Sequence, residues 1–315
     1  MIESLLLWII GILTAPFFSA VILKIKAFFG GKKGPPILIN YYTLIKLFRK
    51  GSVYSTSTTF IFKLGPVVSL SAAVTALMFL PVFGLRPVFS FEGDIIFVLY
   101  LLGLGRFFTI AAAMDTASPF EGMGAAREAF FPIICEATMF MIIILFYKLT
   151  GHLSLAEYFS DSHPSYLWDM AGTSMVFIII SLFIVLLTEN SRVPVDDPAT
   201  HLELTMIHEV MVLDHSGPDL ALIELGAFTK LFFYSTLVSR LIVPFESASF
   251  PSDSPFLVKA AHLPLEICTI IAVYCAVGVM ESVVARYKMN KVPKFILTSF
   301  ALAFFATVIT MEFIK

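Results

Sequence analysis

Long apolar runs separated by short polar segments extend along almost the whole of this 315-residue chain. A helix that crosses the hydrocarbon core of a bilayer needs about 20 mostly apolar residues. The runs that we interpret as spans cover residues 5–23, 64–85, 95–114, 129–147, 170–188, 225–243, 267–280 and 295–311. The pattern predicts an all-α, polytopic membrane protein with about eight transmembrane helices, folded as a single integral membrane domain over residues 1–315.

The composition agrees with a membrane protein. Hydrophobic residues make up 58% of the chain and charged residues only 14%, whereas soluble domains carry about 25% charged residues. Cys135, Cys268 and Cys275 lie in apolar runs without the spacing of a metal site, so we expect them to be packing residues. The N-terminal stretch MIESLLLWII lacks a basic region, which favours an uncleaved first span over a signal peptide. We therefore expect contact with a lipid bilayer and no nucleic-acid partner.

The distribution of Lys and Arg predicts the orientation, because cytoplasmic loops are enriched in these residues. The loops after odd-numbered spans carry Lys24, Lys26, Lys32, Lys33, Lys46, Arg49, Lys50, Lys63, Arg127, Arg192, Arg286, Lys288, Lys291 and Lys294, whereas the loops after even-numbered spans carry Arg86, Lys148 and Lys259. We expect the odd-numbered loops to be cytoplasmic and both termini to lie outside.

One of these loops is acidic: residues 189–209 read ENSRVPVDDPATHLELTMIHE. Asp197 followed by Pro198 is a favourable helix start, and Gly217-Pro218 is a stop signal. Apolar positions at helical spacing would form one face, at Leu204, Ile207 and Met211. We therefore predict a large, helical cytoplasmic docking loop over residues 189–224, between spans 5 and 6.

The charges of this loop indicate its partner. An acidic amphipathic helix suits another protein better than an anionic lipid surface, which favours Lys and Arg. His201 and His208 are seven residues apart and would share a helix face, but the chain has no HExxH motif. We favour polar interface residues over a metal site.

Ionisable side chains inside spans are costly and are candidates for function. Glu136 lies near the middle of span 4, Arg106 lies in span 3, and Glu189 ends span 5. Glu224 begins span 6 and Lys230 follows it. Two interpretations remain open: Arg106 pairs with Glu136 to tie two helices together, or the acids of several spans form a proton relay.

Three stretches carry a family resemblance. Residues 31–51, GKKGPPILINYYTLIKLFRKG, and residues 115–136, DTASPFEGMGAAREAFFPIICE, resemble the quinone-chamber membrane subunit of respiratory complex I. Residues 189–230 begin with Glu-Asn-x-Arg-x-Pro, which recurs in that subunit, but continue with VDDPATHLELTMIHE. This second part of the stretch is more similar to the membrane anchor of group 4 (energy-converting) nickel-iron hydrogenases, of the formate hydrogenlyase and hydrogenase-4 type.

The resemblance implies roles for individual residues. The chain would have no catalytic residue and bind no metal, while partner subunits carry the nickel-iron centre and the iron-sulfur clusters. The implied proton pathway consists of Glu136, Glu189, Glu203, Glu209 and Glu224. The residues implied to dock partners or order the loops are Arg127, Arg192, Asp196, Asp197, His201, His208 and Asp214.

The same resemblance implies an assembly. The hydrogenase large subunit and the iron-sulfur small subunit would lie on the cytoplasmic side, over the loops after spans 1, 3 and 5. Antiporter-like subunits would be the partners within the membrane. The expected location is the prokaryotic plasma (inner) membrane, with coupling of redox chemistry to proton translocation as the expected function.

Two alternatives stay open. A complex I quinone-chamber subunit would have a tunnel for a lipid-like tail between helix 1 and the loop after helix 5. Ile39 and Thr43 replace polar residues often found there, and the histidines replace expected acids, which argues against it. A stand-alone secondary transporter would often show repeated halves and paired helix breaks, and we find neither pattern in the sequence.

Overall fold

The computed structural model describes residues 2–83, 86–159, 163–197, 206–243 and 263–313. The long helices are α1 (Ile2–Phe29), α3 (Phe60–Ala76), α4 (Asp94–Asp115), α5 (Pro119–Thr150), α7 (His163–Glu189), α9 (Gly217–Ile242), α11 (Leu263–Val283) and α12 (Val292–Phe313). The short ones are α2 (Ile39–Phe48), α6 (Leu155–Tyr158), α8 (His208–Met211) and the 3-10 turns η1 (Leu77–Phe79) and η2 (Met289–Lys291). Within these described ranges there is no strand, and eight helices are long and apolar enough to cross a membrane. The predicted all-α membrane fold is confirmed.

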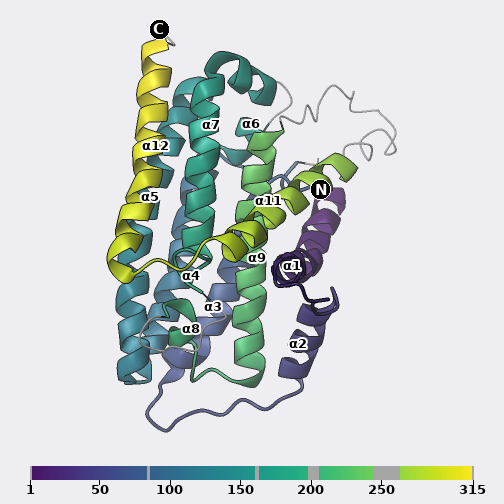
Figure 1. Cartoon of the computed structure of the whole chain (residues 1–315), viewed down its shortest axis with the longest axis vertical. Coiled ribbons are helices and arrows are strands. Elements are labelled where there is room, and N and C mark those ends of the chain that lie inside the picture. The colour runs from purple at the N-terminus through teal and green to yellow at the C-terminus, as the bar shows by residue number, and fades with distance from the viewer. Residues whose placement is uncertain (1, 84–85, 160–162, 198–205, 244–262, 314–315) are drawn as a thin grey trace.

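The long helices form a bundle with two inclined members. Figure 1 shows α5, α7, α9 and α12 upright, whereas α11 crosses the bundle obliquely and α1 is seen nearly end-on. Small residues allow α3 and α4 to approach closely: a Cβ added at Gly65 would lie 2.8 Å from the Ala112 Cβ. Membrane helices commonly pack through such small residues, since burial of apolar surface does not drive their association in lipid.

The second span is shorter than predicted. The sequence pattern extends it to residue 85, but α3 ends at Ala76 and its last turn, η1, ends at Phe79. Leu80 is extended, with φ −93° and ψ 132°. Proline disfavours helical backbone at the residue before it and has no N–H for the helix ladder, so Pro81 ends this span.

The predicted stop at Gly217-Pro218 is wrong, because this pair begins α9. Proline in the first turn loses no hydrogen bond, since the first N–H groups of a helix lack intrahelical partners. Gly217 has φ +56°, and a Cβ there would lie 2.7 Å from the carbonyl oxygen of Gly51. The loop after α7 therefore ends at Ser216, and residues 217–224 belong to α9.

The long helix predicted inside this loop is not found in its described part. Of residues 190–197 and 206–216, only His208–Met211 are α-helical. The helix was predicted over residues 199–213, and its first part, up to residue 205, lies outside the described residues. The Asp196 carboxylate accepts hydrogen bonds from the backbone N–H groups of Ile207 (2.9 Å) and His208 (3.1 Å), and this turns the chain back before α8.

The loops that follow the odd-numbered spans gather at one end of the bundle, which we call the basic end. There, the Val53 N–H donates to the Ser216 hydroxyl at 3.1 Å, and the Asp214 N–H donates to Glu121 at 3.1 Å. In Figure 1, α2 and α8 lie toward this end and both termini lie away from it. The grouping of these loops agrees with the predicted topology, and their cytoplasmic orientation stays a prediction.

A close approach of α5 to α8 fixes the loop after α7, and it can be tested at one glycine. A Cβ at Gly124 would meet Val210 Cγ1 at 2.4 Å and the carbonyl oxygen of Ile207 at 2.9 Å. We expect Gly124→Ala to destabilise the protein by about 1–3 kcal/mol, as overpacking does. The change should lower the melting temperature in detergent and speed proteolysis within residues 190–216.

The matched control is Gly122→Ala on the same helix, where an added Cβ meets nothing within 4 Å. Alanine has the higher helix propensity, so this control should be neutral or slightly stabilising. Equal melting temperatures for the two variants would contradict the close packing of α5 on α8.

Candidate functional site

A buried carboxylate at the end of α7 lies between two cations. The Glu189 side chain is 3% exposed. Arg106 on α4 donates to both of its oxygens at 2.7 and 2.8 Å. Lys230 on α9 lies 2.9 Å from Glu189 Oε2 and donates to the Glu189 carbonyl oxygen at 2.6 Å. A buried charge is stable only when it is paired, so these contacts explain how an ionised group can lie here.

The same arginine extends the network to the side of the bundle. Arg106 Nη1 donates to Glu136 Oε1 on α5 at 3.1 Å. The Glu136 side chain is 47% exposed although it belongs to a spanning helix. The expected Arg106–Glu136 pair is therefore present, and it joins a larger network over α4, α5, α7 and α9.

A small cavity of about 70 Å³ lies beside this network. Arg106, Glu189, Lys230 and Glu128 line it. Glu128 is 7% exposed and was not among the predicted site residues. Its signal in the sequence is its spacing from Glu136, eight residues along α5, which places both acids on one side of the helix.

A larger cavity of about 330 Å³ lies at the basic end, between α1, α2, α9, α11 and the loop after α7. Its polar lining residues are Ser19, Lys26, Asn40, Thr43, Asn190, Ser191, Arg192, Asp196, His208, Glu209, Glu224 and Glu281. Two predicted pathway acids, Glu209 and Glu224, thus face one space although they lie on α8 and α9.

The two cavities share a wall. Asn190, Ser191 and His208 line both of them. Polar groups that line the two cavities therefore form a series from Glu224 in the larger cavity to Glu189 in the smaller one. Arg106, which binds both Glu189 and Glu136, extends this series to Glu136. Chains of protonatable and hydrogen-bonding groups of this kind can carry protons through a membrane protein.

Asp196 closes the loop on which this wall depends. Its side chain is 1% exposed and lies 3.0 Å from Arg286 Nη2, beyond α11. The carboxylate also accepts the N–H groups of Asp197, Ile207 and His208. The buried Asp196 carboxylate thus binds the backbone at Asp197 and again at Ile207 and His208. It also joins this loop to the α11–α12 connection through Arg286.

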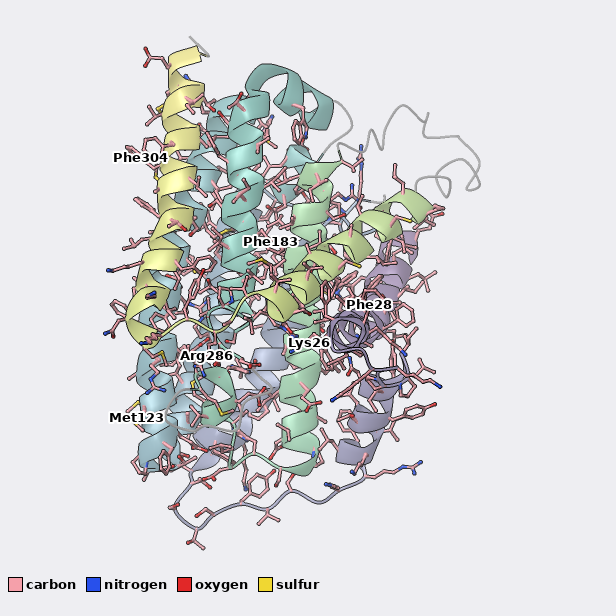
Figure 2. The ribbon with its side chains drawn as sticks, in the orientation of Figure 1. Lys26, Phe28, Met123, Phe183, Arg286 and Phe304 are labelled. Atoms are coloured by element: carbon pink, nitrogen blue, oxygen red, sulfur yellow. The ribbon has the colours of Figure 1, made fainter. Side chains whose placement is uncertain are left out.

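A second ionic cluster lies nearby, and Arg192 is its one member among the predicted site residues. Glu281 on α11 is 1% exposed and pairs with Lys26 of α1 at 3.0 Å and with Arg192 at 3.3 Å. Figure 2 shows Lys26 where α1 meets α11 and Arg286 on the α11–α12 connection. The sequence places Lys26 and Glu281 at the ends of spans, but only the inclination of α1 and α11 brings them together.

The other residues predicted for the site differ in burial and in their contacts. Arg127 on α5 donates to the Met206 carbonyl oxygen at 2.8 Å, at the end of the loop segment. Asp214 is exposed and Asp197 is half-buried. Glu203 and His201 lie outside the described residues. Among the residues that the structure does describe, no group of three or more His, Cys, Asp and Glu side chains is arranged to hold a metal ion.

The family model described as NADH dehydrogenase matches residues 2–311 of this chain. The chain belongs to this family. Hydrogenase-4 component C of Escherichia coli (strain K12) is 28% identical over 278 residues, which cover 88% of this chain and 85% of that protein. Formate hydrogenlyase subunit 4 of the same organism is 23% identical over 310 residues, with coverage of 98% and 96%.

A solved structure of the membrane-bound sulfane sulfur reductase, an archaeal respiratory membrane complex, contains a chain of the same fold. The TM-score is 0.77, the identity is 20%, and the match covers 98% of both chains. The family resemblance inferred from residues 31–51, 115–136 and 189–230 is confirmed. In this member of the NADH dehydrogenase family, described parts of all three stretches supply residues that line the cavities.

The buried network can be tested through its central carboxylate. We expect Glu189→Ala to cost about 3–5 kcal/mol of stability, because Lys230 would lose its counter-charge and Arg106 would keep only the half-exposed carboxylate of Glu136. The melting temperature in detergent measures the loss. A double variant that adds Lys230→Gln should recover part of it, since one unpaired cation is removed.

The control for this network is Glu136→Ala, whose carboxylate is half exposed and binds only one of the two cations. Its melting temperature should fall less than that of Glu189→Ala. Equal losses, or no recovery in the double variant, would refute a central role for Glu189.

His215 provides a pH test of the loop end. It is 4% exposed and stacks on Phe62 with ring centroids 3.9 Å apart. Burial lowers the pKa of His215 to about 4, from about 6.5 in an unfolded chain. The unfolded chain therefore binds the proton first as pH falls. Stability should decrease below pH 6.5, by about 2 kcal/mol at pH 5.

The measurement is the melting temperature at pH 7.5 and at pH 5 for the parent and for His215→Phe, which keeps the ring contact. The variant should lose a smaller part of its stability between these pH values. His152→Gln is the control, because the His152 side chain is 51% exposed. The same pH response in the parent and in His215→Phe would exclude His215 as its cause.

Proposed function

We propose that this chain is the membrane subunit of a group 4 nickel-iron hydrogenase or formate hydrogenlyase-type complex. In this role it docks the peripheral iron-sulfur and hydrogenase subunits and couples their redox chemistry to proton translocation. The similarity to hydrogenase-4 component C and formate hydrogenlyase subunit 4 over most of each chain supports this assignment. The main support for the coupling role is the series of polar groups that leads from the cavity at the basic end to Glu136.

The basic end is the proposed seat of the peripheral arm. It would face the cytoplasm of a prokaryotic cell, with the chain in the plasma membrane and both termini outside, as the distribution of Lys and Arg favours. The loop after α7 and its neighbours would contact the iron-sulfur small subunit and the hydrogenase large subunit. The nickel-iron centre and the iron-sulfur clusters would belong to those partners.

The proposed proton route begins in the larger cavity. Glu209 and Glu224 would exchange protons with the water at the arm, and His208 would pass them through the shared wall. Glu128 and Glu189 would form the next step, and Glu136 the last within this chain. A change of charge in the arm would alter the protonation of these acids, because neighbouring ionisable groups titrate together.

The exposure of Glu136 suggests the continuation of the route. A carboxylate that is 47% exposed on the side of a spanning helix would be costly against hydrocarbon. An antiporter-like membrane subunit that covers α4 and α5 would supply polar groups and accept the proton.

A quinone-chamber subunit of respiratory complex I is the second candidate. The match to the NADH dehydrogenase family favours it, and a cavity of about 330 Å³ is within the size range of small-molecule sites. The many charged and polar groups in its lining are less suited to a hydrophobic tail. Inhibitor-sensitive quinone reduction by the purified complex would select this candidate.

Purification of the tagged chain from native membranes tests the assignment. We expect nickel-iron and iron-sulfur subunits to copurify, as identified by mass spectrometry and by nickel and iron assays, together with hydrogen activity. Copurification of NADH-oxidising subunits without nickel would favour complex I, and a chain that purifies alone would favour a transporter.

The coupling role is tested by Glu136→Gln in that complex. We expect normal assembly and hydrogen activity but a clear loss of proton movement per turnover in sealed vesicles, because the last acid of the route can no longer release a proton. Glu312→Gln, an exposed acid at the end of α12, is the control and should change neither. Unchanged proton movement in Glu136→Gln would disprove the relay role of Glu136.

A further inference from the structure

An uncompensated positive charge marks the region around α2. Residues 24–63 contain no Asp or Glu. Their basic residues are Lys24, Lys26, Lys32, Lys33, Lys46, Arg49, Lys50 and Lys63. Among the described residues, only Lys26 of this group has a carboxylate within ion-pair distance, that of Glu281. The remaining cations therefore lack a counter-charge within the part of the chain that the structure describes.

The position of α2 relates this charge to the membrane. Asn40 Nδ2 donates to the Pro16 carbonyl oxygen at 2.8 Å, and the Tyr41 hydroxyl donates to the Leu13 carbonyl oxygen. Leu13 and Pro16 lie near the middle of α1, which is a membrane-spanning helix. The N-terminal part of α2 therefore lies beside the membrane-embedded part of α1 and not in the space above the bundle.

The outward side of α2 is apolar. Leu38, Tyr42 and Ile45 follow each other at helical spacing and are 48, 57 and 51% exposed. Phe28, at the end of α1, is 80% exposed, and Figure 2 shows it at the outer side of that helix. The exposed apolar surface of α1 thus continues onto α2.

Cations occupy both ends of this apolar surface. Lys32 and Lys33 precede α2, and Lys46, Arg49 and Lys50 lie at its C-terminal end. All five side chains are exposed. An apolar helix face beside Lys and Arg is the pattern of helices that lie in the interface of a membrane with anionic lipids.

We propose that residues 24–50 form a binding surface for anionic phospholipids. The outward face of α2 contacts acyl chains, and the exposed Lys and Arg side chains bind the headgroup phosphates. A protein partner is the less suitable occupant, because α2 lies beside the spanning part of α1 and continues its lipid-facing surface. This inference does not depend on the identity of the catalytic arm.

The bound lipid would also support the larger cavity. Asn40 and Thr43 on the inner side of α2 line this cavity, across from Glu224 on α9. Lipid bound to the outer side of α2 would therefore keep the inner side of α2 in place as a wall of the larger cavity, where the proposed proton route begins.

Tryptophan fluorescence in bilayers tests the proposal with the full chain. The chain has only two tryptophans, Trp8 and Trp168, so a Tyr42→Trp reporter is read by subtraction of the parent signal. Nanodiscs contain either brominated phosphatidylglycerol or brominated phosphatidylcholine at the same mole fraction in a phosphatidylcholine background. We expect quenching of the reporter to be at least about twofold greater with the anionic lipid.

Two controls isolate the headgroup effect. Tyr100→Trp places the same reporter on the spanning helix α4, at a position that is 68% exposed when the chain is alone, and both brominated lipids should quench it equally. Combining Tyr42→Trp with Lys46→Gln, Arg49→Gln and Lys50→Gln should remove most of the preference for phosphatidylglycerol.

Two outcomes would overturn the proposal. Failure of both lipids to quench the Tyr42→Trp reporter would mean that α2 does not contact acyl chains, and equal quenching by both would mean that α2 contacts lipid without headgroup selection. Ile45→Trp is a second reporter on the same face, for use if Tyr42→Trp does not fold.

Discussion

The pairing of Glu189 with Arg106 and Lys230 is the interaction on which the rest of the site depends. Ionised groups inside a membrane bundle are stable only with opposite charges close by. Because these three residues come from α7, α4 and α9, their pairing fixes the relative positions of three spanning helices. The loop that separates the two cavities begins directly after Glu189, so its position also depends on this carboxylate.

Ion pairs beside the proposed route stabilise the structure around it. Asp196 closes the loop segment and pairs with Arg286, while Glu281 joins α1 and α11 through Lys26. Lys26, Asp196 and Glu281 line the larger cavity, so these ion pairs hold part of its wall in place. The anionic-lipid surface proposed on α2 extends the same arrangement outward, because α2 forms one wall of the larger cavity.

The sequence predicted the spans better than the segments between them. Apolar length and charge are local properties, so eight spans and the grouping of the basic loops could be inferred directly. Gly217-Pro218 was misinterpreted because the same two residue types can begin or end a helix, and here they begin α9. The helix predicted after Asp197 failed in the described residues because the Asp196 side chain binds the backbone at Ile207 and His208.

The sequence by itself determined the membrane class, the family, and the acids that lie in or beside spans, because hydropathy and sequence motifs are local properties of the chain. Only the tertiary structure decided which charges meet. Arg106 is 30 residues from Glu136 and 83 from Glu189 along the chain. Glu128 and Glu281, which were not among the predicted site residues, line the cavities because of the packing and inclination of helices. Such long-range contacts depend on how whole helices pack, and no local pattern encodes them.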